Sequence, residues 1–104
     1  MTLVNLMDTA AARLPEVWSS RLLGQVGPAR VRVLRMNDLP LREAVHSGTE
    51  ALLVLDGRLE LDISGRAVTL DKGDLYMVPA GTPHTARRGS HGTLAIVELR
   101  DLVN

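Results

Sequence analysis

The chain of 104 residues contains no cysteine and no phenylalanine, and its only aromatic residues are Trp18 and Tyr76. The absence of cysteine excludes a disulfide framework, a thiolate metal site and a cysteine nucleophile. With two aromatic side chains there is no platform on which successive bases could stack, which argues against binding of single-stranded nucleic acid. The core must therefore be built from aliphatic side chains and methionine.

The chain also lacks an excess of charge, because twelve basic residues balance twelve acidic ones. A neutral protein has no general electrostatic attraction for nucleic acid or for an anionic membrane. No apolar run approaches the roughly 20 residues of a membrane-spanning helix, and the first residues lack the pattern of a signal peptide. We therefore expect one soluble cytoplasmic domain with neither nucleic acid nor membrane as a partner.

The first 28 residues differ from the rest and are predicted to form an N-terminal segment that packs on a barrel domain spanning residues 29–104. Residues 9–14 are typical of a short helix, with Asp8 or Thr9 as its N-cap and Pro15 closing it. Residues 16–23, which include Trp18, are expected to form a second short helix or an irregular segment. Trp18 is expected to be a hydrophobic plug against the barrel or a partner subunit.

From Ala29 onward the apolar residues alternate with polar ones, as in the run ARVRVLRM, and this period of two indicates half-buried strands. The dipeptide Asp56-Gly57 predicts a β-hairpin turn between two such strands. Short strands separated by turn residues predict an all-β antiparallel sandwich or barrel. The expected strands are 29–36, 39–45, 51–55, 59–63, 67–70, 75–78, 84–86 and 93–99.

Two of these strands, 51–55 and 94–99, are apolar on both faces. In a small barrel only one face of a strand points inward. The other face needs a cover, which the N-terminal segment, a partner subunit or both could supply, and on that ground we predict a homodimer.

The stretch GDLYMVPAGTPH, Gly73–His84, concentrates glycine and proline immediately before a histidine. Closely spaced glycine and proline residues bend the backbone sharply and can direct His84 into the mouth of a β-structure. Farther back, His46 and Glu50 are four residues apart, which places them on one face of a strand. Two imidazoles and one carboxylate form a ligand set suited to Fe(II), Mn, Ni or Zn.

At these residues the sequence resembles the cupins. Gly73, Pro79, Gly81 and His84 reproduce the spacing of the second cupin motif up to its histidine. The family pattern continues to an asparagine a few positions later, where this chain has Arg87 and Arg88.

The first cupin motif is matched less completely. Glu50 and Gly57 have the spacing of the motif's glutamate and glycine, and His46 matches its second histidine. Ala44 occupies the position of the first histidine. The resemblance implies a small single-domain cupin, whose fold is a double-stranded β-helix, or jelly-roll barrel.

The resemblance further implies that His46, Glu50 and His84 hold one divalent metal ion and that the protein acts on a small molecule by dioxygenase or isomerase chemistry. Other interpretations remain open. The histidines could be structural, with Glu50 in a buried ion pair; the cavity could bind or sense a ligand without catalysis; or a His–Glu pair could act as an acid–base catalyst without metal. His91, in a Gly/Ser-rich loop, is expected to be a hydrogen-bonding residue of the rim.

Overall fold

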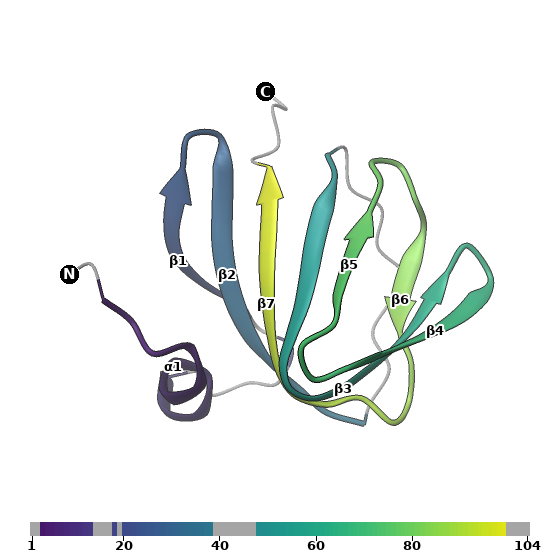
Figure 1. Ribbon diagram of the computed structural model, residues 1–104, viewed down its shortest axis with the longest axis horizontal. Helices are drawn as coiled ribbons and strands as arrows, with labels where there is room; N and C mark the ends of the chain where they lie inside the picture. Colours follow the sequence, from purple (N-terminus) through teal and green to yellow (C-terminus); the bar gives the residue numbers. More distant parts are fainter. Residues whose placement is uncertain (1–2, 14–17, 19, 39–47, 100–104) are drawn as a thin grey trace.

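The structure, a computed structural model, describes residues 3–13, 18, 20–38 and 48–99. One short helix precedes a set of antiparallel strands (Figure 1). The elements are α1 (Leu6–Arg13), β1 (Arg21–Val26), β2 (Ala29–Met36), β3 (Glu50–Ile63), β4 (Arg66–Asp71), β5 (Leu75–Val78), β6 (His84–Ala86) and β7 (His91–Leu99).

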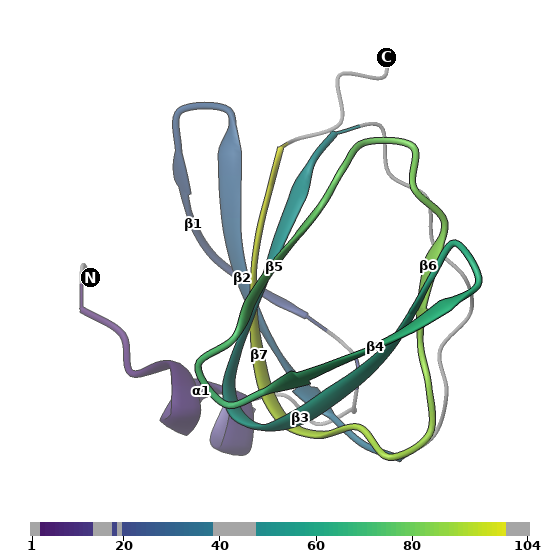
Figure 2. The same ribbon diagram turned by 45° about the vertical axis from the view of Figure 1, so that its right-hand side comes forward.

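The long strand β3 organises the sheet. Its first half pairs with β5 on one side and with β7 on the other, and β7 continues through β2 to β1. Its second half pairs with β4 and β6. Because β3 bends between these halves, its two sets of partners curl toward each other around a common interior (Figure 2). This antiparallel arrangement is the predicted jelly-roll barrel.

Asp56-Gly57 does not form a hairpin, so that prediction is wrong. The strand runs on through both residues, with an irregular register between Val54 and Asp56. Gly57 has a φ of 80° and pairs with Gly92, whose φ is 98°. A Cβ on Gly57 would lie 2.1 Å from the His91 carbonyl oxygen, and a Cβ on Gly92 would lie 2.1 Å from that of Asp56. The two glycines therefore allow the backbones to meet where β3 bends.

The N-terminal segment differs from its prediction in two ways. Helix α1 begins at Leu6, and Asn5 caps it by accepting a 2.9 Å hydrogen bond from the Asp8 amide. Asp8 and Thr9 are thus inside the helix. The expectation of a helix or an irregular segment over 16–23 is wrong from Arg21 onward, because β1 pairs antiparallel with β2. The predicted strand 39–45 lies outside the described residues.

The main core fills the interior with aliphatic side chains from both halves of β3 and from the facing strands, among them Leu52, Val54, Leu59 and Leu61. Outside the barrel, Ala10 of α1 covers the fully buried Val33 of β2. Farther along that outer surface, Leu75, Met77 and Val97 remain at least 42% exposed. No helix in the part of the chain that the structure describes is long and apolar enough to cross a membrane.

Candidate functional site

His84 is oriented by the turn that precedes it. The Thr82 amide donates to the Pro79 carbonyl at 3.2 Å, and Gly81, with a φ of 76°, takes the left-handed position of this turn. The chain then enters β6 at His84, whose side chain is 9% exposed. Its Nδ1 atom lies 2.9 Å from the Thr82 carbonyl oxygen. The Pro/Gly turn thus directs the imidazole into the barrel, as the sequence predicted.

Glu50, the first residue of β3, meets His84 across the interior. Its Oε1 atom lies 3.2 Å from His84 Nε2, and its side chain is 6% exposed. The two residues come from different sets of strands, since Glu50 pairs with Val78 of β5 and His84 pairs with Ile63 at the far end of β3. Their approach depends on the bend of β3 at Gly57.

The hydrogen bond to Thr82 determines how His84 faces Glu50. A carbonyl oxygen can only accept, so Nδ1 carries the hydrogen of that bond. In the neutral imidazole, Nε2 then presents its lone pair to the Glu50 carboxylate, which is also an acceptor. A positive species between two such acceptors, 3.2 Å apart in a buried place, makes their contact favourable. That species can be a proton or a metal cation.

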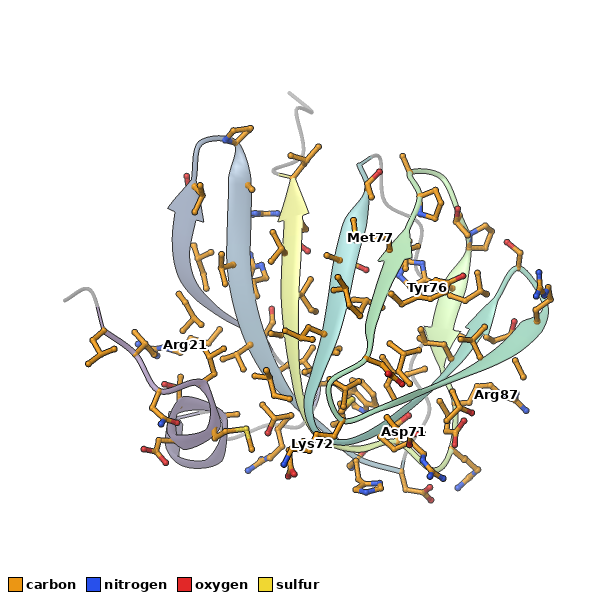
Figure 3. All side chains as sticks on the ribbon, viewed as in Figure 1. Arg21, Asp71, Lys72, Tyr76, Met77 and Arg87 are labelled. Atoms are coloured by element: carbon orange, nitrogen blue, oxygen red, sulfur yellow. The ribbon has the colours of Figure 1, made fainter. Side chains whose placement is uncertain are left out.

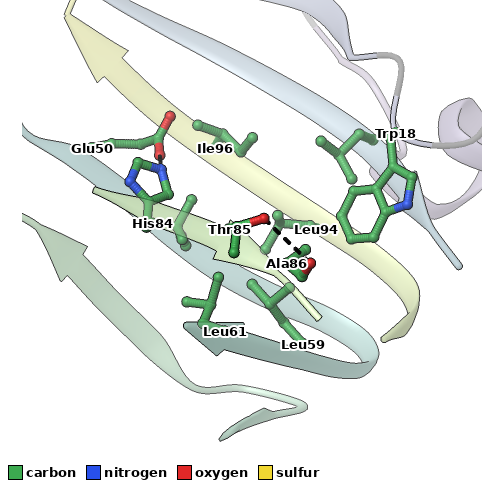
Figure 4. A pocket seen from close by; sticks show the side chains of 11 residues that line it. Trp18, Glu50, Leu59, Leu61, His84, Thr85, Ala86, Leu94 and Ile96 are labelled. Carbon is green, nitrogen blue, oxygen red and sulfur yellow. Dashed lines mark hydrogen bonds and ion pairs between the residues drawn. The ribbon is translucent and has the colours of Figure 1, made fainter. Parts of the chain in front are cut away.

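A cavity of about 130 Å³ opens beside this pair (Figure 4). Apart from Glu50, His84 and Thr85, its described lining is apolar and comes from β2, β3, β6, β7 and the segment before β1. These apolar residues are Trp18, Leu34, Leu52, Leu59, Leu61, Ala86, Leu94 and Ile96. The cavity thus has one polar end and a largely aliphatic body.

Charged residues continue the inner face beyond Glu50. Glu98 of β7 is in register with Glu50 on one side and with Arg30 of β2 on the other. Its Oε2 atom accepts from Arg30 at 2.8 Å and from Arg32 at 3.1 Å. This cluster of Arg30, Arg32 and Glu98 borders the polar end of the cavity.

The structure brings together two of the three predicted ligands. His46 and Ala44 lie outside the described residues, so the complete set of His46, Glu50 and His84 stays a prediction. Within the ranges that the structure describes, no three His, Asp or Glu side chains are grouped closely enough to hold a metal ion. His91 is the first residue of β7, is exposed and is not among the described lining residues of the cavity, and its Nδ1 atom lies 3.3 Å from the Gly89 carbonyl oxygen.

The side chains around the second motif have structural roles. Asp74 closes the turn before β5 by accepting from the Asp71 amide at 2.8 Å. Tyr76 and Met77 belong to β5 and are labelled in Figure 3. Tyr76 packs on the main core, Met77 is 53% exposed, and neither is among the described lining residues. Arg87 and Arg88 are exposed beyond β6, and Arg88 lies 3.7 Å from Asp38.

The sequence did not identify Trp18 as a cavity residue or Glu98 as a neighbour of Glu50. Trp18 could have been suspected because it is the only tryptophan in a chain almost without aromatic residues. Glu98 gave no signal, since its position depends on the pairing of β7 with both β2 and β3.

A jelly-roll barrel with a buried histidine and glutamate beside an interior cavity defines the general class of cupin-like barrels. The family model of the cupin domain matches residues 38–99, and the chain belongs to the cupin family.

The solved structures that resemble this chain share its fold. A cupin-2 domain protein from Shewanella frigidimarina superposes with a TM-score of 0.83 at 20% identity, covering 94% of this chain and 95% of that one. An RmlC-like cupin from the same organism gives a TM-score of 0.70 at 18% identity, covering 80% and 76% of the two chains.

A curated relative shares a shorter stretch of sequence. Quercetin 2,3-dioxygenase of Bacillus subtilis strain 168 is 52% identical over 50 residues. This match covers 47% of the present chain and 15% of that enzyme.

Proposed function

We propose that the protein is a metal-dependent cupin enzyme in which His46, Glu50 and His84 hold one divalent ion, Fe, Mn, Ni or Zn, and that it acts on a small oxygen-bearing molecule in the cavity. The observation that carries this proposal is the buried pair of acceptors, His84 Nε2 and Glu50 Oε1, 3.2 Å apart. Two ligands at about 2.1 Å from a common ion and at roughly right angles lie about 3.0–3.2 Å apart. The spacing of these two atoms is therefore compatible with a shared metal ion, and His46 would complete the ligand set.

The residues of the chain have separate tasks in this proposal. The Thr82 carbonyl holds the Nδ1 hydrogen of His84 and so keeps Nε2 directed inward. The Glu50 carboxylate supplies negative charge, and the aliphatic walls give the body of the cavity an apolar surface. A bound divalent ion would supply Lewis-acid polarisation of a substrate oxygen.

The similarity to quercetin 2,3-dioxygenase supports dioxygenase chemistry as the reaction class. Because this match is short, isomerase chemistry and a binding or sensing role without catalysis stay open as alternatives to dioxygenase chemistry. Acid–base catalysis by a protonated His84–Glu50 pair without metal is the other reaction that the geometry accommodates.

Metal content and thermal stability test the proposal. The purified wild type, incubated with Fe(II), Mn, Ni or Zn and freed of excess ion, should retain about one equivalent and show a raised Tm, because an ion that binds only the folded state stabilises it. His84→Ala, His46→Ala and Glu50→Gln should each lose the bound ion.

His91→Ala is the matched control, since His91 is an exposed histidine outside the cavity lining. It should bind metal like the wild type. If the wild type holds no ion and its Tm does not change with any of the four metals, the proposed metal-dependent function is contradicted. That result would favour the binding or acid–base alternatives.

A further inference from the structure

Trp18 forms one end of the cavity, and the Glu50–His84 pair forms the other (Figure 4). Between them lie aliphatic side chains of β3, β6 and β7, among them Leu61, Ala86 and Leu94. A ligand in this cavity would therefore contact an acceptor-rich or metal-bearing end and an aromatic end at the same time.

Hydrogen bonds to the end of β2 and to the residue after it help to hold Trp18 in position. Its backbone amide donates to the Arg35 carbonyl at 2.7 Å, and its indole Nε1 donates to Asn37 Oδ1 at 3.1 Å. Because Asn37 takes the polar edge of the indole, the ring contributes apolar surface to the cavity.

The backbone conformation of Trp18 is unusual. Its φ is 67°, in the left-handed region that bulky side chains rarely adopt. Residues in such conformations persist where surrounding contacts hold them. Here the two hydrogen bonds, together with packing of the indole against the main core, provide that support.

The volume of the cavity limits what can fit between its ends. At about 130 Å³ it is comparable to the engineered protein cavities, of about 150 Å³, that accommodate benzene. A three-ring molecule such as quercetin is larger than this space. One substituted six-membered ring matches this volume, whereas a larger molecule would have to extend through the open side of the cavity.

From these observations we propose that Trp18 is the end wall of the ligand cavity and sets its size selectivity, so that the protein accepts a single-ring, largely apolar molecule with one oxygen-bearing end. The oxygen-bearing end faces Glu50 and His84, and the ring contacts Trp18. This inference is independent of the metal, since the Glu50–His84 pair can receive a hydroxyl group by hydrogen bonding as well as through an ion.

Phenol and 2-naphthol are suitable probes because they differ by one ring and share the hydroxyl group. We expect phenol to change the Trp18 emission of the chelator-treated wild type, and calorimetry to show at least about tenfold weaker binding of 2-naphthol. Trp18 is the only tryptophan of the chain, so its emission reports this wall alone.

Trp18→Ala should reverse the preference by removing the end wall, so that 2-naphthol binds more tightly than phenol. Asn37→Ala keeps the indole but removes its hydrogen-bond acceptor, and should narrow the difference between the probes. Met77→Ala is the control, because Met77 is exposed and outside the cavity lining, and it should keep the wild-type preference. If Trp18→Ala does not fold, Trp18→Leu and Asn37→Ala still test the wall.

The proposal is overturned if phenol does not bind the wild type, if it binds without changing the Trp18 emission, or if the ratio of the two affinities is the same in the wild type and the folded Trp18 variants. A loss of metal binding in the separate metal experiment leaves these readouts unchanged, so the two proposals fail independently.

Discussion

Glu98 shows how a single residue supports the polar end of the barrel. One carboxylate oxygen accepts from both Arg30 and Arg32, and the three side chains are only 16–23% exposed. The carboxylate keeps two neighbouring guanidinium groups together on the inner face of the sheet. Since Glu98 is in register with Glu50, we expect a change in this cluster to affect the position of Glu50 in the candidate site.

We predict that Glu98→Gln lowers the free energy of unfolding by about 1–3 kcal/mol, because it leaves two partly buried guanidinium groups without their counter-charge. Urea denaturation would measure the loss. The loss should shrink as salt is added, since salt screens the repulsion between Arg30 and Arg32.

Asp71→Asn provides the comparison for Glu98→Gln. Asp71 accepts from Arg58 at 2.9 Å in an ion pair whose side chains are 50–60% exposed. Exposed pairs of this kind contribute about 0–1 kcal/mol. Equal losses in the two variants would contradict a special role for the Glu98 cluster.

Among the elements, β3 has the most demanding local geometry. Its bend requires Gly57 to combine a positive φ with a close approach to the His91 carbonyl. The nearby turn residue Gly65 also has a positive φ, 86°, but no atom lies within 4 Å of where its Cβ would be. Alanine substitutions at Gly65 and Gly57 therefore distinguish the cost of backbone strain alone from the cost of strain combined with steric overlap.

Gly65→Ala is predicted to cost about 1–2 kcal/mol, the strain of a left-handed non-glycine residue. Gly57→Ala should cost about 3 kcal/mol or more, because its Cβ would also collide with backbone atoms of β7. Chemical denaturation of both variants measures the difference, and similar costs would mean that β3 and β7 can separate easily at the bend.

The sequence predicted those strands in which the apolar pattern is clear. The prediction was wrong where one sequence pattern is compatible with more than one local backbone structure. Alternation and the surrounding turns located β2, β5 and β6 at their observed bounds. Asp-Gly suits both a hairpin turn and a bulge with positive φ, and only the pairing of Gly57 with Gly92 decides between them. Strand β1 is an edge strand that is exposed along nearly its whole length. Because neither of its faces is buried, its sequence shows no alternation of apolar and polar residues.

The candidate site was predictable to a similar degree. Spacing within the two motifs pointed to Glu50 and His84, which lie 3.2 Å apart in the structure. Their role as metal ligands stays a prediction. The packing of Trp18 against the barrel was predicted. Its place at one end of the cavity was not, because that place depends on a backbone conformation with positive φ that the sequence does not indicate.

At the scale of the whole molecule, an uncovered apolar surface lies on the outside of β3, β5 and β7. Ala51 is in register with Met77 on one side and Val97 on the other, and Leu53 is in register with Leu75. We call Ala51, Leu53, Leu75, Met77 and Val97 the outer apolar face. The homodimer stays a prediction, and this face is where we expect it to form.

Light scattering coupled to size-exclusion chromatography should find a dimer at micromolar concentration. Val97→Asp and Met77→Asp should each shift the protein to monomer, because a charge on the face would be buried without a partner. Ala67→Asp, an exposed change on β4, should leave the dimer intact. A monomeric wild type would contradict the prediction.

The bend at Gly57 also bears on how the chain folds. Because β3 passes without a break from one set of partners to the other, a register chosen against β7 in its first half fixes which side chains of its second half point inward. The two halves of the barrel therefore cannot adopt their registers separately. We expect folding to occur as a single cooperative transition, without an intermediate in which only one half has its native pairing.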